Sequence, residues 1–171
     1  MMRIETERLI LRRFESGDEA ALYAYLSDKE VVKWEPYAPI TRDQIGEVLR
    51  ERMASDEMMA IELKENHTVI GNVYLGKDAF WTRELGYLLN RAYWGHGYAT
   101  EACTAAVEKA FADGTHRVYA ECDPGNEKSW RLLERLGFIR EAHLRENVYF
   151  WLDENGCPIW KDTYIYGKLK P

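Results

Sequence analysis

The segment from Glu84 to Ala102 holds the residues of this chain that are best suited to bind a ligand. A strand-like run, Glu84–Leu89, leads into a loop with Gly95 and Gly97, and a helical pattern follows at once. The first turn of a helix has backbone N–H groups without partners and carries partial positive charge. Glycine lets a backbone approach a ligand closely. The segment therefore predicts a phosphate site built from main-chain amides.

Two other phosphate-binding motifs fit this loop poorly. The dinucleotide fingerprint G-x-G-x-x-G needs a third glycine where this chain has Thr100. The P-loop of ATP-binding proteins needs a Lys-Ser or Lys-Thr pair after the glycines, which this chain lacks. A nicotinamide-dependent oxidoreductase stays as an alternative, and an isolated G-x-G can also be only a tight turn.

The residues around the two glycines have a wider resemblance. Trp94–Ala102 (WGHGYATEA) resembles the acyl-CoA pyrophosphate loop of the GNAT superfamily of N-acetyltransferases, which is written Q/R-x-x-G-x-G/A. Gly97 and Ala99 take the last two fixed positions, whereas Trp94 stands where Gln or Arg is usual. The aromatic form followed by A-T-E-A looks like the subgroup of ribosomal-protein alanine N-acetyltransferases.

Two further segments are similar to the same family and lie in the family's order. The opening strand TERLILR covers residues 6–12, and the helical segment NEKSWRLLERLGF covers residues 126–138. The resemblance therefore extends over nearly the whole chain. It implies one GNAT domain over residues 1–171 of α/β (α+β) class: a mixed, mostly antiparallel sheet with splayed central strands, flanked by helices.

The resemblance also implies the reaction. Acetyl-CoA would be the cosubstrate, and a primary amine would attack its thioester directly, without a covalent enzyme intermediate. The enzyme would mainly orient the two reactants and polarise the carbonyl group. By the same resemblance, the cofactor would be held by the strand end, the glycine loop and the start of the later helix: Leu88, Leu89, Asn90, Gly95, His96, Gly97, Tyr98, Ala99, Thr100, Asn126 and Ser129.

The leaving thiolate would gain from a nearby acid. Many relatives place a Tyr seven residues after the Asn of the helical segment, but here that position is Leu133. The hydroxyl that remains is Ser129, three residues after Asn126, and the subgroup carries Ser there. A hydrogen bond at the helix start is the structural alternative for Ser129. Without the usual Tyr, a non-catalytic acyl-CoA sensor is the alternative function.

The attacking amine must lose a proton, which calls for a base. Glu84 opens the strand beside the expected cleft, where several relatives use a carboxylate, and a solvated charge at the strand end is its structural alternative. Glu141 and His143 are weaker candidates. The histidine of the glycine loop needs only its amide.

The acceptor is poorly determined by the sequence. The loop Trp34–Pro39 and the aromatic run Tyr149–Trp151 could both line its pocket, and for the aromatic run we favour a place in the core. With 23 basic and 29 acidic residues, the net charge of −6 suits a cationic amine, a peptide N-terminus or an aminosugar and argues against nucleic acid. A homodimer is a further expectation from the family.

The sequence predicts a cytoplasmic protein with no membrane-spanning segment and no metal site. We identify no signal peptide and no run of about 20 apolar residues. The three cysteines are scattered, which argues against a disulfide framework. The His and Cys residues also lack metal-ligand spacing.

The element order that positions these residues is predicted as β-α-α-β-β-β-α-β-α-β-β. Ser16-x-x-Glu19 and Thr41-x-x-Gln44 are capping boxes that predict helix starts. Small and apolar residues at helical spacing predict the long helix after the glycine loop, which ends near Asp113. The remaining helix is expected at 126–136, with strands at 7–14, 58–64, 68–75, 84–89 and 118–122 and two more after residue 138, reversing at 153–156.

Overall fold

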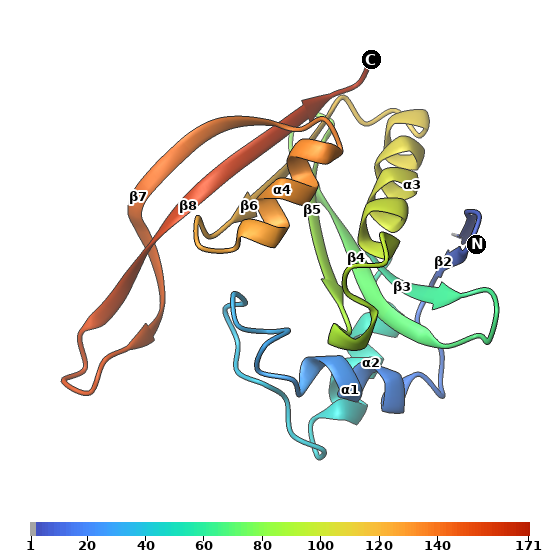
Figure 1. Cartoon of the computed structure of the whole chain (residues 1–171), viewed down its shortest axis with the longest axis horizontal. Coiled ribbons are helices and arrows are strands. Elements are labelled where there is room, and N and C mark those ends of the chain that lie inside the picture. Colours follow the sequence, from blue (N-terminus) through green and yellow to red (C-terminus); the bar gives the residue numbers. More distant parts are fainter. Residues whose placement is uncertain (1–2) are drawn as a thin grey trace.

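One mixed sheet of eight strands organises the chain, in the spatial order β1-β2-β3-β4-β5-β6-β8-β7 (Figure 1). The structure is a computed structural model that describes residues 3–171. Neighbouring strands run antiparallel except β5 and β6, which are parallel. The strands are β1 Arg3–Glu5, β2 Leu9–Arg12, β3 Met58–Leu63, β4 Val69–Asp78, β5 Thr82–Leu89, β6 Arg117–Cys122, β7 Ile139–Leu152 and β8 Pro158–Leu169.

Helices cover both faces of the sheet. They are α1 Glu19–Leu26, α2 Ile45–Ala54, α3 Tyr98–Ala112 and α4 Glu127–Arg135. The buried side chains of α3 and α4 share one apolar core with the sheet, and those of α1 and α2 form a second core on the opposite face. Alternation along a strand divides its side chains between the faces, so that Met59 and Ile61 enter the first core and Ala60 the second. Within residues 3–171, no helix is long and apolar enough to cross a membrane.

The predicted element order and the GNAT-type fold class are confirmed, with one strand added. The three-residue strand β1 precedes the predicted opening strand and pairs with it, from Arg3 opposite Arg12 to Glu5 opposite Ile10. A segment this short carries no readable alternation, so its partner strand is what defines it. The helix expected at 126–136 is confirmed as α4, and Gly137, with φ +79°, follows its C-cap residue Leu136.

The two capping boxes form only in part. α1 begins at Glu19, and the Glu19 carboxylate accepts from the Gly17 amide (2.9 Å) rather than from Ser16. Gly17 has φ +108° and turns the chain there, so the predicted N-cap at Ser16 is wrong. In the second box, the Gln44 side chain does accept from the Thr41 amide (2.9 Å). However, α2 begins only at Ile45 with Gln44 as its N-cap, so the predicted N-cap at Thr41 is also wrong.

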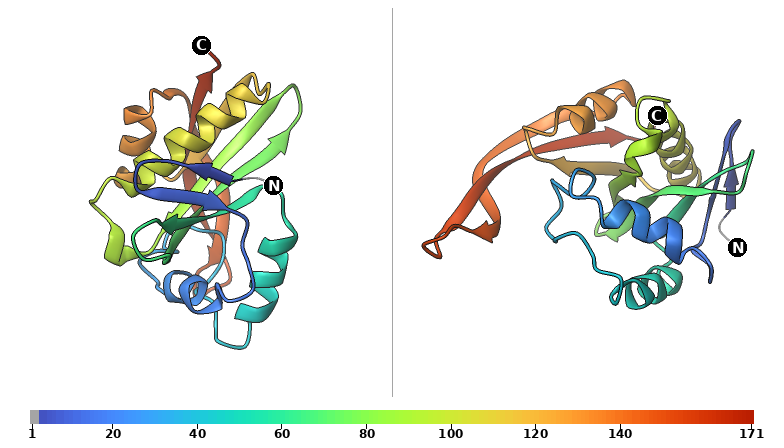
Figure 2. Two further views of the ribbon diagram at one scale, coloured as in Figure 1. Left: turned by 90° about the vertical axis from the view of Figure 1, so that its right-hand side faces the viewer. Right: turned by 60° about the horizontal axis from the view of Figure 1, so that its bottom comes forward.

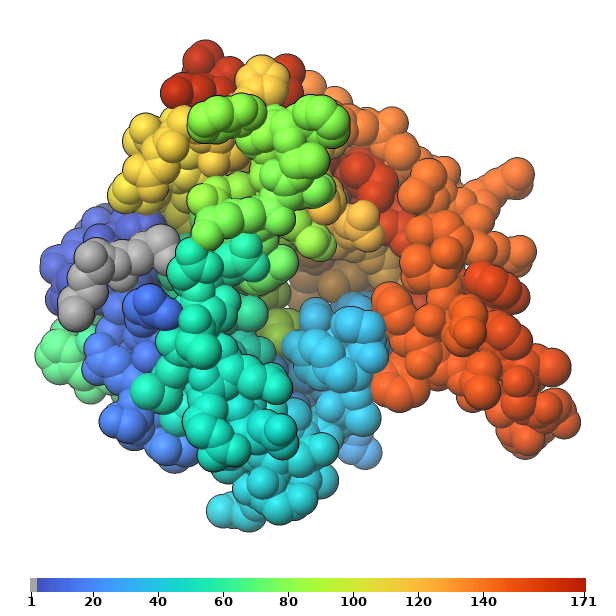
Figure 3. All heavy atoms as spheres, turned by 180° about the vertical axis from the view of Figure 1, so that it is seen from behind, coloured from blue at the N-terminus to red at the C-terminus, as the bar shows by residue number. Residues whose placement is uncertain are grey.

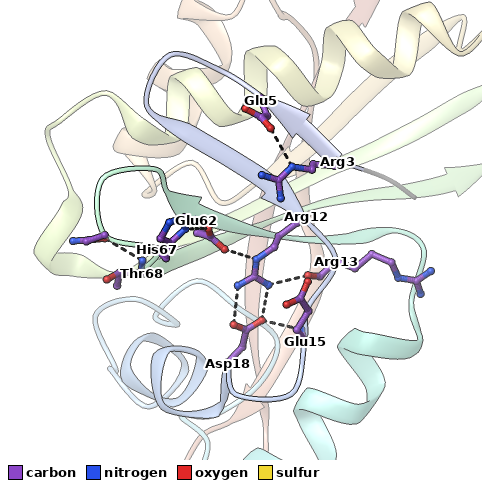
Figure 4. A network of polar contacts seen from close by, with 10 residues as sticks. Arg3, Glu5, Arg12, Arg13, Glu15, Asp18, Glu62, His67 and Thr68 are labelled. Carbon is purple, nitrogen blue, oxygen red and sulfur yellow. Dashed lines mark hydrogen bonds and ion pairs between the residues drawn. The ribbon is translucent and has the colours of Figure 1, made fainter.

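Arg12 ties β2 to α1 and β3 (Figure 4). Its Nη1 and Nη2 lie 2.8 and 2.9 Å from the two carboxylate oxygens of Asp18, and its Nε donates to Glu62. Glu62 also contacts Nδ1 of His67 at 2.7 Å. The Asp18 carboxylate is thus used for this ion pair instead of capping α1. The network fixes the helix against the sheet through largely buried charges.

The β7–β8 hairpin extends beyond the helical layers (Figure 2). Tyr149 is 49% exposed and packs edge-on against Trp160, with ring centroids 5.3 Å apart. Trp151 is 42% exposed. The expectation that Tyr149–Trp151 belongs to the core is therefore wrong, because none of the helices within residues 3–171 covers this part of the hairpin. Reversal at 153–156 is confirmed, since the Gly156 amide donates to the Asp153 carbonyl oxygen (3.0 Å).

Candidate active site

The central strands β5 and β6 pair only at their first residues. Their register runs from Thr82 opposite Arg117 to Glu84 opposite Tyr119. Beyond that point β5 stays paired with β4 as far as Leu89, while β6 follows β8. The two strands therefore diverge, as the resemblance implied. A cleft of about 1530 Å³ occupies the gap.

The cleft continues to the surface between the α1–α2 loop and the β7–β8 hairpin. Figure 3 shows these two segments in light blue and orange, with a hollow beside them in which deeper residues are visible. Elements from both faces of the sheet thus line one continuous space: β4, β5, the glycine loop, the start of α3, the end of β6, α4, the α1–α2 loop and the hairpin.

The glycine loop delivers an unpaired helix N-terminus to one end of the cleft. Gly95 and Gly97 have φ +80° and +81°, which side chains other than glycine rarely adopt. α3 begins directly after Gly97, so the amides of its first turn have no intrahelical acceptors. Trp94 anchors the loop, because its Nε1 donates to the Leu89 carbonyl oxygen at 2.7 Å. This contact gives the unusual aromatic residue a structural role.

Basic side chains of α4 stand beside this helix N-terminus. Lys128, Arg131 and Arg135 line the cleft. The Lys128 ammonium lies 4.3 Å from the centroid of the Trp94 ring, and Arg131 pairs with Glu127 at 2.6 Å. The positive charges and the free amides make this end of the cleft suitable for a polyanion.

Most of the predicted cofactor residues line the cleft: Leu88, Leu89, Gly95, Gly97, Tyr98, Ala99, Thr100, Asn126 and Ser129. Asn90 and His96 are not among its lining residues. The Asn90 side chain accepts from the Ala92 amide (3.0 Å) and so starts the short 3-10 turn Arg91–Tyr93. The His96 carbonyl oxygen accepts from Arg8 Nη1 (2.9 Å), and its ring stacks on that of Tyr98. Both residues shape the loop rather than the cavity wall.

Glu84 lies where the two strands separate and lines the cleft. Burial raises the pKa of its carboxyl, and the nearby charges of Glu121 and Asp78 raise it further. A carboxylate with a raised pKa is a stronger base than an ordinary glutamate. The structural alternative, a fully solvated strand end, does not match this half-buried position.

Ser129 lies at the face of β5 opposite to that of Glu84, and it has an unexpected partner. Its Oγ is 2.8 Å from the phenolic oxygen of Tyr87, which also lines the cleft. Leu133, at the position where many relatives carry Tyr, is fully buried in the core. Sequence reasoning missed Tyr87 because no motif marks it. The available signal was its position on β5. Residues two apart on a strand share one face, so Tyr87 faces the core together with Leu85 and Leu89.

The other end of the cleft is lined by aromatic and acidic groups. Trp34, Glu35 and Tyr37 come from the α1–α2 loop and Phe150 from β7, which places the predicted loop at the cavity wall. Burial raises the pKa of Glu35, opposed by hydrogen bonding from Tyr37 and by the charge of Arg52. The carboxylates here, Glu30, Glu35, Glu84 and Glu121, outnumber the basic side chains Lys33, Arg52 and Lys161, so this end suits a cation.

The weaker candidate bases lie outside the cleft lining. His143 Nε2 contacts Oδ2 of Asp162 at 2.6 Å, and Glu141 forms an ion pair with Arg117. The first pair lies within the β7–β8 hairpin, and the second joins β7 to β6. Among the residues that the structure describes, no three His, Cys, Asp or Glu side chains gather closely enough to hold a metal ion.

Comparison with known proteins agrees with this geometry. The family described as "Acetyltransferase (GNAT) domain" matches residues 8–139. The uncharacterized N-acetyltransferase YnaD of Bacillus subtilis is 30% identical, covering 99% of this chain and 98% of its own. The [ribosomal protein uS5]-alanine N-acetyltransferase of Escherichia coli is 27% identical, covering 99% and 92% of the two chains. The resemblance to the ribosomal-protein alanine subgroup is thus confirmed at the level of similarity.

A solved structure confirms the fold. The GNAT-family acetyltransferase from Bacillus anthracis superposes with a TM-score of 0.90 at 30% identity, covering 99% of each chain. The relatives carry the name N-acetyltransferase, which supports an enzyme over the sensor alternative and acyl transfer over nicotinamide chemistry. The chain belongs to the GNAT family of N-acetyltransferases.

Proposed function

We propose that this enzyme transfers an acetyl group from acetyl-CoA to a primary amine that enters the acidic end of the cleft. The observation that carries the proposal is the divergence of β5 and β6 beyond Glu84, because it opens a continuous passage through the sheet to the free N-terminus of α3. One end of that passage suits a diphosphate and the other suits a cationic amine.

The glycine loop and α4 would hold the nucleotide part of acetyl-CoA. The amides of Gly95 to Thr100 would donate to the diphosphate, and the Thr100 hydroxyl could add a bond. Lys128 and Arg131 would balance the phosphate charge. The pantetheine arm would lie along β5 near Leu88 and Leu89, where β6 no longer occupies the strand edge.

Glu84 would serve as the base, directly or through a water molecule. The bound ammonium first loses a proton to solvent, because only the neutral amine has a lone pair. Its nitrogen then attacks the thioester carbonyl carbon, a C–N bond forms, and the nitrogen passes a second proton to the carboxylate. The raised pKa of Glu84 favours this acceptance. The tetrahedral intermediate then collapses, the C–S bond breaks, and the electron pair stays on sulfur. Ser129 would assist this departure from the other side of β5.

The acceptor would be a peptide N-terminus or a small amine. Glu30, Glu35 and Glu121 line the acceptor end and favour a positively charged group. The relative from E. coli acts on an alanine of ribosomal protein uS5, by its name, which supports the peptide option. Cytoplasmic location and a homodimer belong to the same proposal. The free thiols of Cys103, Cys122 and Cys157 suit a reducing compartment, and light scattering would test the dimer.

Calorimetric titration with CoA, together with a thiol-release assay on acetyl-CoA, would test the proposal. The acceptor panel should hold peptides with free N-termini, the same peptides N-acetylated, polyamines, aminosugars and amino acids. We expect CoA to bind and thiol release to require a free amine. Gly97→Val should abolish binding, because a β-branched residue rarely adopts the positive φ that the loop has at this position. If the variant still binds CoA, the nucleotide lies elsewhere.

A further inference from the structure

Tyr87 and Ser129 place two hydroxyl groups side by side between β5 and α4. The phenolic oxygen lies 2.8 Å from Ser129 Oγ and 3.1 Å from the Ser129 carbonyl oxygen. Both residues line the cleft near the point where the strands diverge. The helical segment that resembles the family leads to Ser129 alone, so the partner is visible only in the structure.

The phenol has a single proton, and Ser129 offers it two acceptors. In the first arrangement, the phenol donates to the carbonyl oxygen, and Ser129 Oγ must then donate to the phenol across the 2.8 Å contact. The serine proton then points at the phenol and not into the cleft. When the phenol donates to Oγ instead, the serine proton is free to point into the cleft. Only this second arrangement can serve a leaving group.

The acidity of the two groups limits what they can do. Burial raises the pKa of the Tyr87 phenol far above its ordinary value, and the nearby Cys103 thiol contributes to this shift. A thiol ionises near 8.5 in water. A thiolate therefore does not remove the proton from this phenol, and a serine hydroxyl is a weaker acid still. The pair can stabilise a negative sulfur by donating hydrogen bonds, without either group ionising.

We infer that Tyr87 is a positioning residue that donates to Ser129 Oγ and thereby directs the Ser129 proton onto the departing thiolate sulfur. The inference rests on the proposed function, since it assumes a thioester in the cleft. As the C–S bond breaks, the electron pair moves to sulfur and the Ser129 O–H donates to it. The proton that finally makes the thiol comes from solvent. In this way the Tyr87–Ser129 pair would replace the Tyr that many relatives carry at the position of Leu133.

A double-mutant cycle tests the coupling between the two hydroxyls. Ser129→Ala should lower kcat about 100-fold, as the loss of one donor to a developing anion does. Tyr87→Phe should lower kcat about tenfold, with the KM for acetyl-CoA unchanged within about twofold. In the Ser129→Ala background, Tyr87→Phe should have no further effect, because its acceptor is gone. Tyr166→Phe is the matched control: its phenol bonds Glu134 of α4 at 3.0 Å but does not line the cleft.

Three results would overturn the inference: losses that multiply in the double variant, a Tyr87→Phe effect on KM alone, or an equal loss in Tyr166→Phe. If Tyr87→Phe does not fold, 3,5-difluorotyrosine at position 87 keeps the ring and lowers the phenol pKa. Its alkaline loss of kcat should then begin at lower pH than in the wild type, and an unchanged profile would contradict the inference. A wild-type protein that neither binds CoA nor releases thiol would instead refute the proposed function itself.

Discussion

The Arg8 guanidinium and the Glu101 carboxylate join the N-terminal strands to the helix that presents the glycine loop, with Arg8 Nε 2.7 Å from Glu101 Oε2. The Arg8 amide and the Thr6 hydroxyl also donate to Glu101. Burial opposes ionisation of Glu101, but these bonds outweigh it and lower the pKa of the carboxyl. Arg8 further donates to the His96 carbonyl oxygen inside the loop. The pair thus holds the loop in place before any ligand arrives.

We predict that Glu101→Gln raises the KM for acetyl-CoA roughly tenfold, with kcat nearly unchanged, because about 1.4 kcal/mol of charge-assisted bonding to the loop would be lost. Initial-rate kinetics with varied acetyl-CoA would measure this. Glu5→Gln is the matched control, since its exposed carboxylate pairs with Arg3 and Lys64 and with no residue of the loop. An equal rise in KM for the control, or a loss confined to kcat, would contradict the loop-holding role.

The pH dependence of the reaction should report Glu84. A base acts when deprotonated, so kcat/KM should rise with pH through a pKa that lies above the ordinary glutamate value, since burial, Glu121 and Asp78 all raise it. Glu121→Gln removes one of these charges and should move the acidic limb to lower pH. Glu108→Gln, an equal charge change on the exposed face of α3, should leave the limb in place. A limb that survives in Glu84→Gln would assign the base to another group.

The sequence predicted the fold and the glycine loop before α3 because both depend on local patterns. Periodicity identified the long helix α3, and the glycines marked a backbone that must have positive φ. The three segments similar to the GNAT family placed these elements in order. Ser129 followed from its spacing to Asn126, which does cap α4 through its side chain.

Other parts of the site depend on contacts between residues far apart in the chain. Tyr87 meets Ser129 across 42 positions, and Arg8 meets Glu101 across 93, so no local pattern records either pair. The segment around Tyr149 has the aromatic composition of a core strand. Its side chains are nevertheless exposed, because the hairpin extends beyond the helices into solvent. Composition shows what a segment can bury, whereas tertiary arrangement decides whether anything covers it.

Stability should depend strongly on Arg12. Its side chain is 12% exposed between Asp18 and Glu62, which are 10% and 9% exposed. Arg12→Met would leave two largely buried carboxylates without their cation, so we predict a loss of roughly 3 kcal/mol in the free energy of unfolding. Urea denaturation followed by circular dichroism would measure it. Arg50→Met on the exposed face of α2 should change the midpoint little, and comparable losses in both variants would refute the role given to the network.

The same network should make stability depend on pH in a defined direction. Burial opposes ionisation of Glu62, but hydrogen bonds from His67 and Arg12 outweigh it and lower the folded-state pKa below the ordinary 4.5. As acid is added, Glu62 therefore becomes protonated at a lower pH in the folded state than in the unfolded state. The contribution is therefore complete above about pH 4.5 and is lost as the pH falls through the folded-state value. In Glu62→Gln, denaturation midpoints should fall less steeply below pH 5 than in the wild type, and parallel curves would contradict this.

Gly125 controls the position of Trp34 at the acceptor end. A Cβ at residue 125 would meet the Trp34 ring at 2.8 Å, closer than packed atoms allow, so Gly125→Ala must displace the indole. The ammonium groups of Lys33 and Lys161 also lie close to that ring, 4.9 and 5.1 Å from its centroid. We therefore predict that Gly125→Ala raises the KM for the amine severalfold, on the order of 1 kcal/mol, while the KM for acetyl-CoA stays near its wild-type value.

The control for this prediction is Gly46→Ala. A Cβ there would make only an ordinary contact, 3.7 Å from Arg50, and alanine in the first turn of α2 should stabilise the helix by less than about 1 kcal/mol. Kinetics for both substrates should therefore be unchanged in Gly46→Ala. If Gly125→Ala instead raises the KM for acetyl-CoA and spares that for the amine, Trp34 belongs to the cofactor side of the cleft, and the assignment of its two ends must be reversed.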